Sequence, residues 1–165
     1  TLKEALDQKK IRVEETGNVN ELTVENLSSK EEIFIQAGEI VRGGKQDRVL
    51  SVDLILGPKS GKVPVGAFCV EHGRWQRRGT EPIAYFGGSD NLVSSNALRL
   101  AIVKDQSQSE VWANVQASQR RLSASVGAPV ASPASARLRR AAAILCATIS
   151  EPTKRPLRSR IAAAR

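Results

Sequence analysis

The stretch of residues 38–75 limits most strongly what this chain can fold into. It holds two compact polar clusters, at residues 43–48 and 69–75. Two apolar runs separate the clusters, and the turn-forming sequence Gly57-Pro58-Lys59-Ser60-Gly61 joins these runs. Because a strand pair joined by a turn returns the chain to its starting point, we expect the two clusters to meet at one edge of a sheet. We also expect the functional site there.

Short runs with a period of two dominate the first 71 residues. Such alternation is typical of antiparallel strands with one buried face. The run 32–37 is almost continuously apolar, which predicts a central strand. These features predict an α+β fold with a β-rich antiparallel, sandwich-like or strongly curved sheet over about residues 11–71. The expected strands are 11–14, 19–25, 32–37, 49–56 and 62–70.

Helix-forming sequence flanks this β region. Residues 2–9 favour a short N-terminal helix. Residues 76–89 are expected to form an irregular connection, and 96–101 to form either a short helix or a strand. Ser107 and Glu110 have capping-box spacing at the start of a further helix, and that helix carries an apolar stripe. The stripe consists of Val111, Trp112, Val115 and Leu122.

The positive charge of the chain is concentrated at its end. The formal net charge is +8, but residues 127–165 hold eight basic residues and only one acid, Glu151. We therefore expect a single β-rich domain with following helices over 1–126 and a basic, partly helical Ala/Arg/Ser/Pro-rich tail over 127–165. Any contact with nucleic acid or an acidic partner is assigned to this tail.

The remaining composition narrows the function classes. Cys69, Cys146 and the single His72 do not have metal-site spacing, so no metal centre is predicted. No run has the length of a membrane helix and no signal-peptide pattern is present, which favours a cytoplasmic location. Neither a cofactor nor an oligomeric state follows from the sequence.

The first polar cluster is not a phosphate-binding P-loop. That motif needs glycine where Glu39 stands and serine or threonine where Gln46 stands. A glycine turn with Lys45 and Arg48 beside it still suits a phosphate or a carboxylate. The alternative, which turn statistics favour, is a solvated hairpin corner.

The second cluster offers one carboxylate of interest. Glu71 ends an apolar strand, where a carboxylate has either a cationic partner or a ligand, and a structural salt bridge explains it equally well. Cys69 is expected to be a small buried hydrophobe. Trp75, in the basic run that starts at Arg74, could stack on a nucleotide base or simply pack on the edge of the core.

The runs 38–48 and 69–75 resemble a prokaryotic family, the ADP-ribosylglycohydrolase- and rhodanese-phosphatase-associated protein domain, whose activity is unassigned. The resemblance covers about residues 1–122 and includes the opening Leu2-Lys3-Glu4-Ala5-Leu6, the run Val19-Asn20-Glu21-Leu22 and the helix start Ser109-Glu110-Val111-Trp112. It implies a β-rich domain with flanking helices and a polar site made by both motifs. The implied site residues are Glu39, Gly43, Gly44, Lys45, Gln46, Arg48, Glu71, Arg74 and Trp75.

The associations of this family imply ADP-ribose, NAD or nucleotide-linked metabolism. Our leading hypothesis is a domain that binds a phosphorylated or nucleotide-like ligand. Lys45 and Arg48 would meet the anion, Gly43 and Gly44 would supply backbone donors, and Glu71 would be the acid–base group if a reaction occurs. The alternative is a non-enzymatic interaction module that works through the basic tail. Whether the domain is an enzyme is left open.

Overall fold

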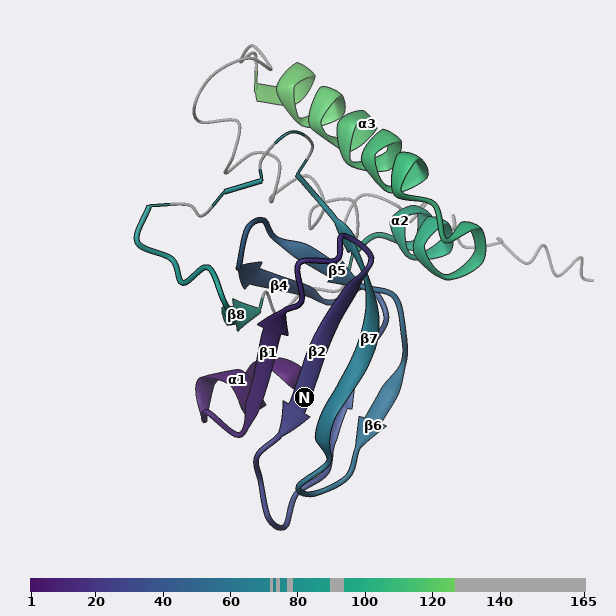
Figure 1. Cartoon of the computed structure of the whole chain (residues 1–165). Coiled ribbons are helices and arrows are strands. Elements are labelled where there is room, and N and C mark those ends of the chain that lie inside the picture. Colours follow the sequence, from purple (N-terminus) through teal and green to yellow (C-terminus); the bar gives the residue numbers. More distant parts are fainter. Residues whose placement is uncertain (72, 74, 77–78, 90–93, 127–165) are drawn as a thin grey trace, which may run out of the picture.

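The computed structural model describes residues 1–71, 73, 75–76, 79–89 and 94–126. A short helix precedes seven strands, an eighth strand follows after a connection, and the helices come last (Figure 1). The elements are α1 (Leu2–Asp7), β1 (Ile11–Glu15), β2 (Glu21–Asn26), β3 (Ile33–Ile35), β4 (Ile40–Gly43), β5 (Arg48–Leu50), β6 (Leu54–Leu56), β7 (Gly61–Cys69), β8 (Phe86–Ser89), α2 (Asn96–Leu100), the π-helical turn η1 (Ala101–Asp105) and α3 (Gln108–Val126).

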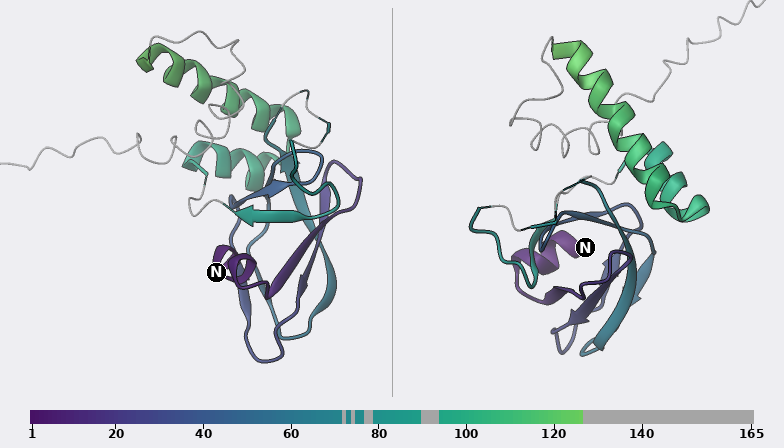
Figure 2. Two further views of the ribbon diagram at one scale, coloured as in Figure 1. Left: turned by 90° about the vertical axis from the view of Figure 1, so that its left-hand side faces the viewer. Right: turned by 45° about the horizontal axis from the view of Figure 1, so that its top comes forward.

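Six of the strands form one antiparallel sheet that curls almost into a closed barrel. Their order is β1-β2-β7-β5-β4-β8, so β1 and β8 are the two edges. A bridge between Glu14 and Tyr85 joins these edges, and the Glu15 N–H donates to the Ala84 carbonyl at 3.0 Å. The curvature is visible in the right-hand view of Figure 2. The predicted α+β class, with helices before and after an antiparallel sheet, is confirmed.

The two-residue period of β1 and β2 builds the main core. Ile11, Val13, Leu22 and Val24 point inward and are at most 4 % exposed, as the alternation predicted. Full burial of such a side chain contributes roughly 1.5–3 kcal/mol. Helix α1 closes this core through Leu2, and Thr1 caps the helix in a capping box with Glu4.

Three strand predictions need correction. The run at residues 32–37 was expected to be central, but β3 pairs only with β6 in a separate two-stranded sheet. Phe34 is accordingly 45 % exposed. The run 49–56 is not one strand, because Ser51–Asp53 carries the chain from the large sheet to the small one. There the Asp53 carboxylate accepts the Ala37 N–H at 2.8 Å, which fixes the crossing point.

The third correction concerns β8, which lies inside the expected irregular connection. Gly87 and Gly88 have low strand propensity, so the sequence pattern does not indicate this strand. A Cβ atom at Gly88 would lie 3.0 Å from an Arg42 guanidinium nitrogen, so glycine leaves room for that side chain across the strand pair.

The C-terminal helices cover one end of the sheet (Figures 1 and 2). The alternative of a helix at 96–101 is confirmed, since the Ser95 hydroxyl accepts the Leu98 N–H and caps α2. At the start of α3 the Ser107 hydroxyl accepts the Glu110 N–H at 3.4 Å. The helices and the sheet share a second apolar cluster, formed by Ile40, Val49, Phe68, Val70, Leu98, Ile102, Val111 and Val115.

The two polar clusters meet as the sequence predicted. Strands β5 and β7 are antiparallel neighbours, and Arg48 lies opposite Cys69 in their register. The turn at residues 57–61 lets β7 run back beside β5. The end of the first cluster and the start of the second therefore lie side by side on neighbouring strands, at one end of the sheet.

The glycine at position 44 is required by both conformation and space. Its φ is +59°, and a Cβ atom there would lie 2.7 Å from Phe86 Cζ. We expect Gly44→Ala to lower the free energy of unfolding by at least about 1–2 kcal/mol, because a left-handed conformation alone costs that much outside glycine. Urea denaturation followed by circular dichroism measures it.

Gly57 provides the matched control for this substitution. Its φ lies outside the left-handed region and a Cβ atom there meets nothing within 4 Å. Gly57→Ala should change the free energy of unfolding by less than about 0.5 kcal/mol. Equal effects of the two substitutions would show that the Gly44 turn is not constrained as described.

Candidate functional site

Arg48 lies at the centre of the two clusters and is fully buried. Its side chain is 0 % exposed and forms an ion pair with Glu15, whose side chain is 4 % exposed, at 2.9 Å. The other terminal nitrogen donates to the Val19 carbonyl and, at 3.1 Å, to Cys69 Sγ. The guanidinium therefore connects β5 with β1, with β7 and with Val19, which precedes β2. Its role in the fold is structural.

Asp47 and Glu71 join the first cluster to the second. The Asp47 N–H donates to Glu71 Oε2 at 3.3 Å, and the Asp47 carbonyl accepts the Val70 N–H at 3.2 Å. Both side chains are buried, at 1 % and 4 % exposure. The carboxylate of Glu71 is thus held in place from the residue that precedes β5.

A pocket of about 270 Å³ opens where these groups meet the helices. It contains three of the residues predicted from the sequence, Gln46, Glu71 and Trp75. The other lining residues were not predicted as site residues: Val19, Cys69, Gly73, Gln108 and Trp112. The chain has two tryptophans, so both of them line this one pocket.

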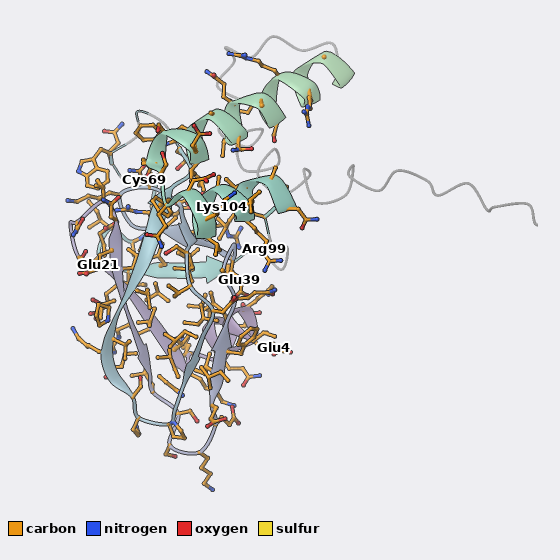
Figure 3. All side chains as sticks on the ribbon, turned by 90° about the vertical axis from the view of Figure 1, so that its right-hand side faces the viewer. Glu4, Glu21, Glu39, Cys69, Arg99 and Lys104 are labelled. Carbon is orange, nitrogen blue, oxygen red and sulfur yellow. The ribbon has the colours of Figure 1, made fainter. Side chains whose placement is uncertain are left out.

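Gln108 attaches the start of α3 to the end of β7. Its side-chain oxygen accepts the Cys69 N–H at 2.8 Å, and its side-chain nitrogen donates to the Cys69 carbonyl at 2.8 Å. The side-chain amide thereby makes the same pair of hydrogen bonds with β7 that the main chain of a neighbouring strand would make. Figure 3 shows Cys69 at the sheet end below α3. This contact brings Trp112, one helical turn later, to the pocket.

A family model described as the ARG and Rhodanese-Phosphatase-superfamily-associated Protein domain, ARPP-1, matches residues 1–154. The chain belongs to the ARPP-1 family. The match extends past the region of about 1–122 that the motifs indicated, and it includes much of the basic tail. Searches of curated proteins and of solved structures found no match.

In this ARPP-1 chain the backbone donors of the glycine turn are already engaged. The Gly43 N–H donates to Asp47 Oδ1 at 3.3 Å, and the Gly44 N–H donates to the Pro82 carbonyl at 3.0 Å. The Lys45 N–H reaches Glu15 Oε2 at 3.4 Å. These backbone N–H groups stabilise the turn through acceptors within the fold, so they do not serve as donors to an anion.

Lys45 and Trp75 lie together at the rim of the pocket. The Lys45 Nζ is 5.0 Å from the centre of the Trp75 ring, a cation–π distance. Arg48 contacts the same ring, with its Cζ 5.3 Å from the ring centre. Trp75 remains 42 % exposed, so part of its ring is open to a ligand.

Cys69 is a poor nucleophile in this setting. Burial raises the pKa of its thiol, and the neighbouring Glu15 and Glu71 carboxylates raise it further, whereas Arg48 lowers it. A protonated thiol does not attack, because the thiolate is the reactive form. The expectation that Cys69 is a small buried residue is confirmed by its 2 % exposure.

Glu39 lies apart from the pocket. It precedes β4, whereas the glycine turn follows that strand, and its Oε2 accepts the Gln36 N–H at 2.8 Å. Figure 3 places Glu39 near Arg99 of α2. Burial raises the pKa of its carboxyl, while the Gln36 hydrogen bond and the distant N-terminal charge lower it.

Several predictions fall outside the described residues, namely those for Arg74, His72, Cys146 and the tail at 127–165. Within the described residues, no group of three or more His, Cys, Asp or Glu side chains could hold a metal ion. No helix among them has the length and hydropathy needed to cross a membrane.

Removal of Glu15 should destabilise the fold strongly. Glu15→Ala leaves Arg48 buried without its counter-charge, a loss of about 3–5 kcal/mol in the free energy of unfolding. Glu14→Ala is the control, since the neighbouring Glu14 pairs with Lys62 at the surface and such pairs contribute at most about 1 kcal/mol. Urea denaturation distinguishes the two, and equal losses would contradict the role given to Arg48.

The raised pKa of Glu39 predicts a pH-dependent stability. A carboxyl whose pKa is higher in the fold than in the unfolded chain contributes stability that is complete below its ordinary pKa of 4.5 and is lost as pH rises through the folded-state pKa. Glu39→Gln keeps an oxygen for the Gln36 N–H and never ionises. We expect this variant to be more stable than wild type at neutral pH.

The advantage of Glu39→Gln should shrink to nothing as the pH falls below the ordinary pKa of 4.5. Denaturant midpoints measured across that range test it. Glu32→Gln, at the exposed position immediately before β3, serves as the control and should show no such trend. A constant difference between Glu39→Gln and wild type would refute the assignment.

Proposed function

We propose that the pocket binds the flat ring of a nucleotide-like small molecule. The observation that carries the proposal is that both tryptophans of the chain line one pocket with the polar side chains Gln46 and Glu71. Aromatic faces stack on bases and contribute roughly 1–3 kcal/mol per base. The name of the ARPP-1 family, through its ADP-ribosylglycohydrolase association, supports the same class of ligand.

The size of the pocket favours a single ring system. Its volume of about 270 Å³ is smaller than the roughly 300–1,000 Å³ of pockets that enclose drug-sized ligands. A whole dinucleotide such as NAD would not fit inside. We propose that only the base enters and that the sugar and phosphate lie at the rim.

Lys45 is the proposed phosphate contact. Of the two cations that the sequence suggested, Arg48 is fully buried and paired with Glu15, whereas Lys45 is at the rim. Gln46 would orient the base through its side-chain amide. Glu71 lines the pocket and is the group through which any acid–base chemistry there would run.

Intrinsic tryptophan fluorescence tests the proposal, because both reporters line the site. Titration with AMP, GMP, ADP-ribose and NAD should give a saturable change for the ligands that insert a ring. Trp75→Phe and Trp112→Phe each leave one reporter, and each remaining signal should respond. Ribose 5-phosphate, which has no base, is the control and should leave the emission unchanged.

No saturable change with any base-containing ligand, in protein that circular dichroism shows to be folded, would overturn the proposal. A response that survives only at Trp75 would place the ligand on the exposed rim and would contradict entry of the base into the pocket.

The role of Lys45 has a separate test. Lys45→Gln should weaken the binding of AMP several-fold without changing the affinity for adenosine, because only the nucleotide carries the anion. Lys59→Gln, at an exposed position of the turn between β6 and β7, is the matched control and should leave both affinities unchanged. Equal weakening of adenosine and AMP by Lys45→Gln would assign Lys45 to the Trp75 ring alone.

A further inference from the structure

A second pocket opens where the two edge strands of the curled sheet come together. The bridge between Glu14 and Tyr85 joins β1 to β8. The residues that come next in this antiparallel arrangement, 11–13 of β1 and 86–87 of β8, line a pocket of about 450 Å³. Helix α1 packs against both strands here, as Figure 1 shows. We call this space the seam pocket.

The walls of the seam pocket are apolar side chains from four elements or their ends. Ile11, Val13 and Phe86 belong to the core and are at most 4 % exposed, so they form its deep part. Leu6 of α1 and Leu27, which follows β2, are half-buried and complete the apolar lining. The volume lies within the roughly 300–1,000 Å³ of pockets that enclose small molecules.

Two cationic residues, Lys9 and Arg12, also line the seam pocket. Arg12 lies 3.9 Å from the Glu14 carboxylate and 3.5 Å from that of Glu25, and Lys62 pairs with Glu14 as well. Arg12 and Lys62 thus balance the two glutamates. The Lys9 ammonium has no ion pair or hydrogen bond with another described residue. Among the described residues, this group therefore carries one unbalanced positive charge, which favours a ligand with a single negative charge.

Lys9 occupies a backbone position that favours glycine. Helix α1 ends in a Schellman motif, in which the Lys9 N–H donates to the Leu6 carbonyl at 3.0 Å and the Lys10 N–H donates to the Ala5 carbonyl at 2.8 Å. The φ of Lys9 is +55°, in the left-handed region that glycine adopts most readily. Any advantage of lysine at this position therefore lies in its side chain.

We propose that the seam pocket binds a small carboxylate with an apolar chain or ring. The apolar part displaces water from Leu6, Leu27 and the core residues beneath them. The carboxylate pairs with the Lys9 ammonium, and the hydroxyl of Tyr85, whose side chain is 52 % exposed, is a further donor in the lining. A phosphate dianion would leave one negative charge without a partner.

This site is separate from the pocket of the proposed function, because the two pockets share no lining residue. Its test needs a reporter of its own, and the single tyrosine of the chain, Tyr85, provides one. Incorporation of 3-fluorotyrosine places one ¹⁹F nucleus in the seam pocket. Failure of the carboxylate proposal is therefore measured at Tyr85, whereas failure of the nucleotide proposal is measured at the tryptophans.

Titration of the fluorinated protein with octanoate should shift the ¹⁹F resonance saturably. Hexanoate should bind roughly 4- to 15-fold more weakly, because two fewer methylene groups leave water. Octan-1-ol has the chain without the charge and should bind at least about threefold more weakly than octanoate. Acetate has the charge without the chain and should give no saturable shift.

Lys9→Gly separates the side chain of this residue from its backbone. The variant should bind octanoate at least about threefold more weakly and octan-1-ol unchanged. Its urea midpoint should rise, because glycine adopts the positive φ without strain. Lys59→Gly is the matched control, since Lys59 is exposed, has a φ of +52° and lies outside the seam pocket. Its urea midpoint should also rise, but its affinity for octanoate should not change.

Three results would count against the proposal. Absence of a saturable ¹⁹F shift with octanoate, in protein that circular dichroism shows to be folded, would overturn it as a whole. Equal affinities for octanoate and octan-1-ol would assign the seam pocket to an uncharged apolar ligand and refute the carboxylate. An unchanged affinity of Lys9→Gly for octanoate would show that Lys9 is not the counter-charge.

Discussion

A guanidinium inside a protein needs fixed acceptors in place of water, and the two terminal nitrogens of Arg48 find them in three parts of the chain. The Glu15 carboxylate, the Val19 carbonyl and the Cys69 sulfur all receive its N–H groups. Because a buried charge without a partner is costly, movement of any one of these acceptors away from Arg48 would destabilise the fold. The path of β1, the residues that lead into β2 and the end of β7 are thus fixed relative to one another, and the pocket inherits this rigidity.

The same interaction changes how the polar clusters should be interpreted. A basic residue beside a glycine turn suggests anion binding. Here, however, Arg48 pairs with Glu15, and the turn N–H groups donate to the carboxylates of Glu15 and Asp47 inside the fold. The pocket is lined instead by Glu71, Gln46 and the two tryptophans. Polar residues that lie next to each other in sequence have separated into a structural set and a lining set.

Local patterns predicted what local physics determines. The alternation in β1 and β2, the Ser95 cap and the return of β7 beside β5 all follow from periods of two, capping chemistry and turn residues. Strand β8 was not predicted because Gly87 and Gly88 have low strand propensity. The Arg42 side chain accounts for the glycine at position 88 alone, since a Cβ atom at Gly87 would meet nothing within 4 Å. The contact of Gln108 was not predicted for a different reason. Its partner Cys69 is 39 residues away, and no local sequence pattern around either residue indicates that they pair.

The way in which Gln108 contacts Cys69 has a consequence for variation at the site. The amide binds only the main-chain N–H and carbonyl of residue 69, which every amino acid except proline can supply. Helix α3 therefore stays attached whatever side chain stands at that position. Residue 69 lines the pocket, so its side chain can alter the pocket lining without removing the two main-chain hydrogen bonds that attach the helix carrying Trp112.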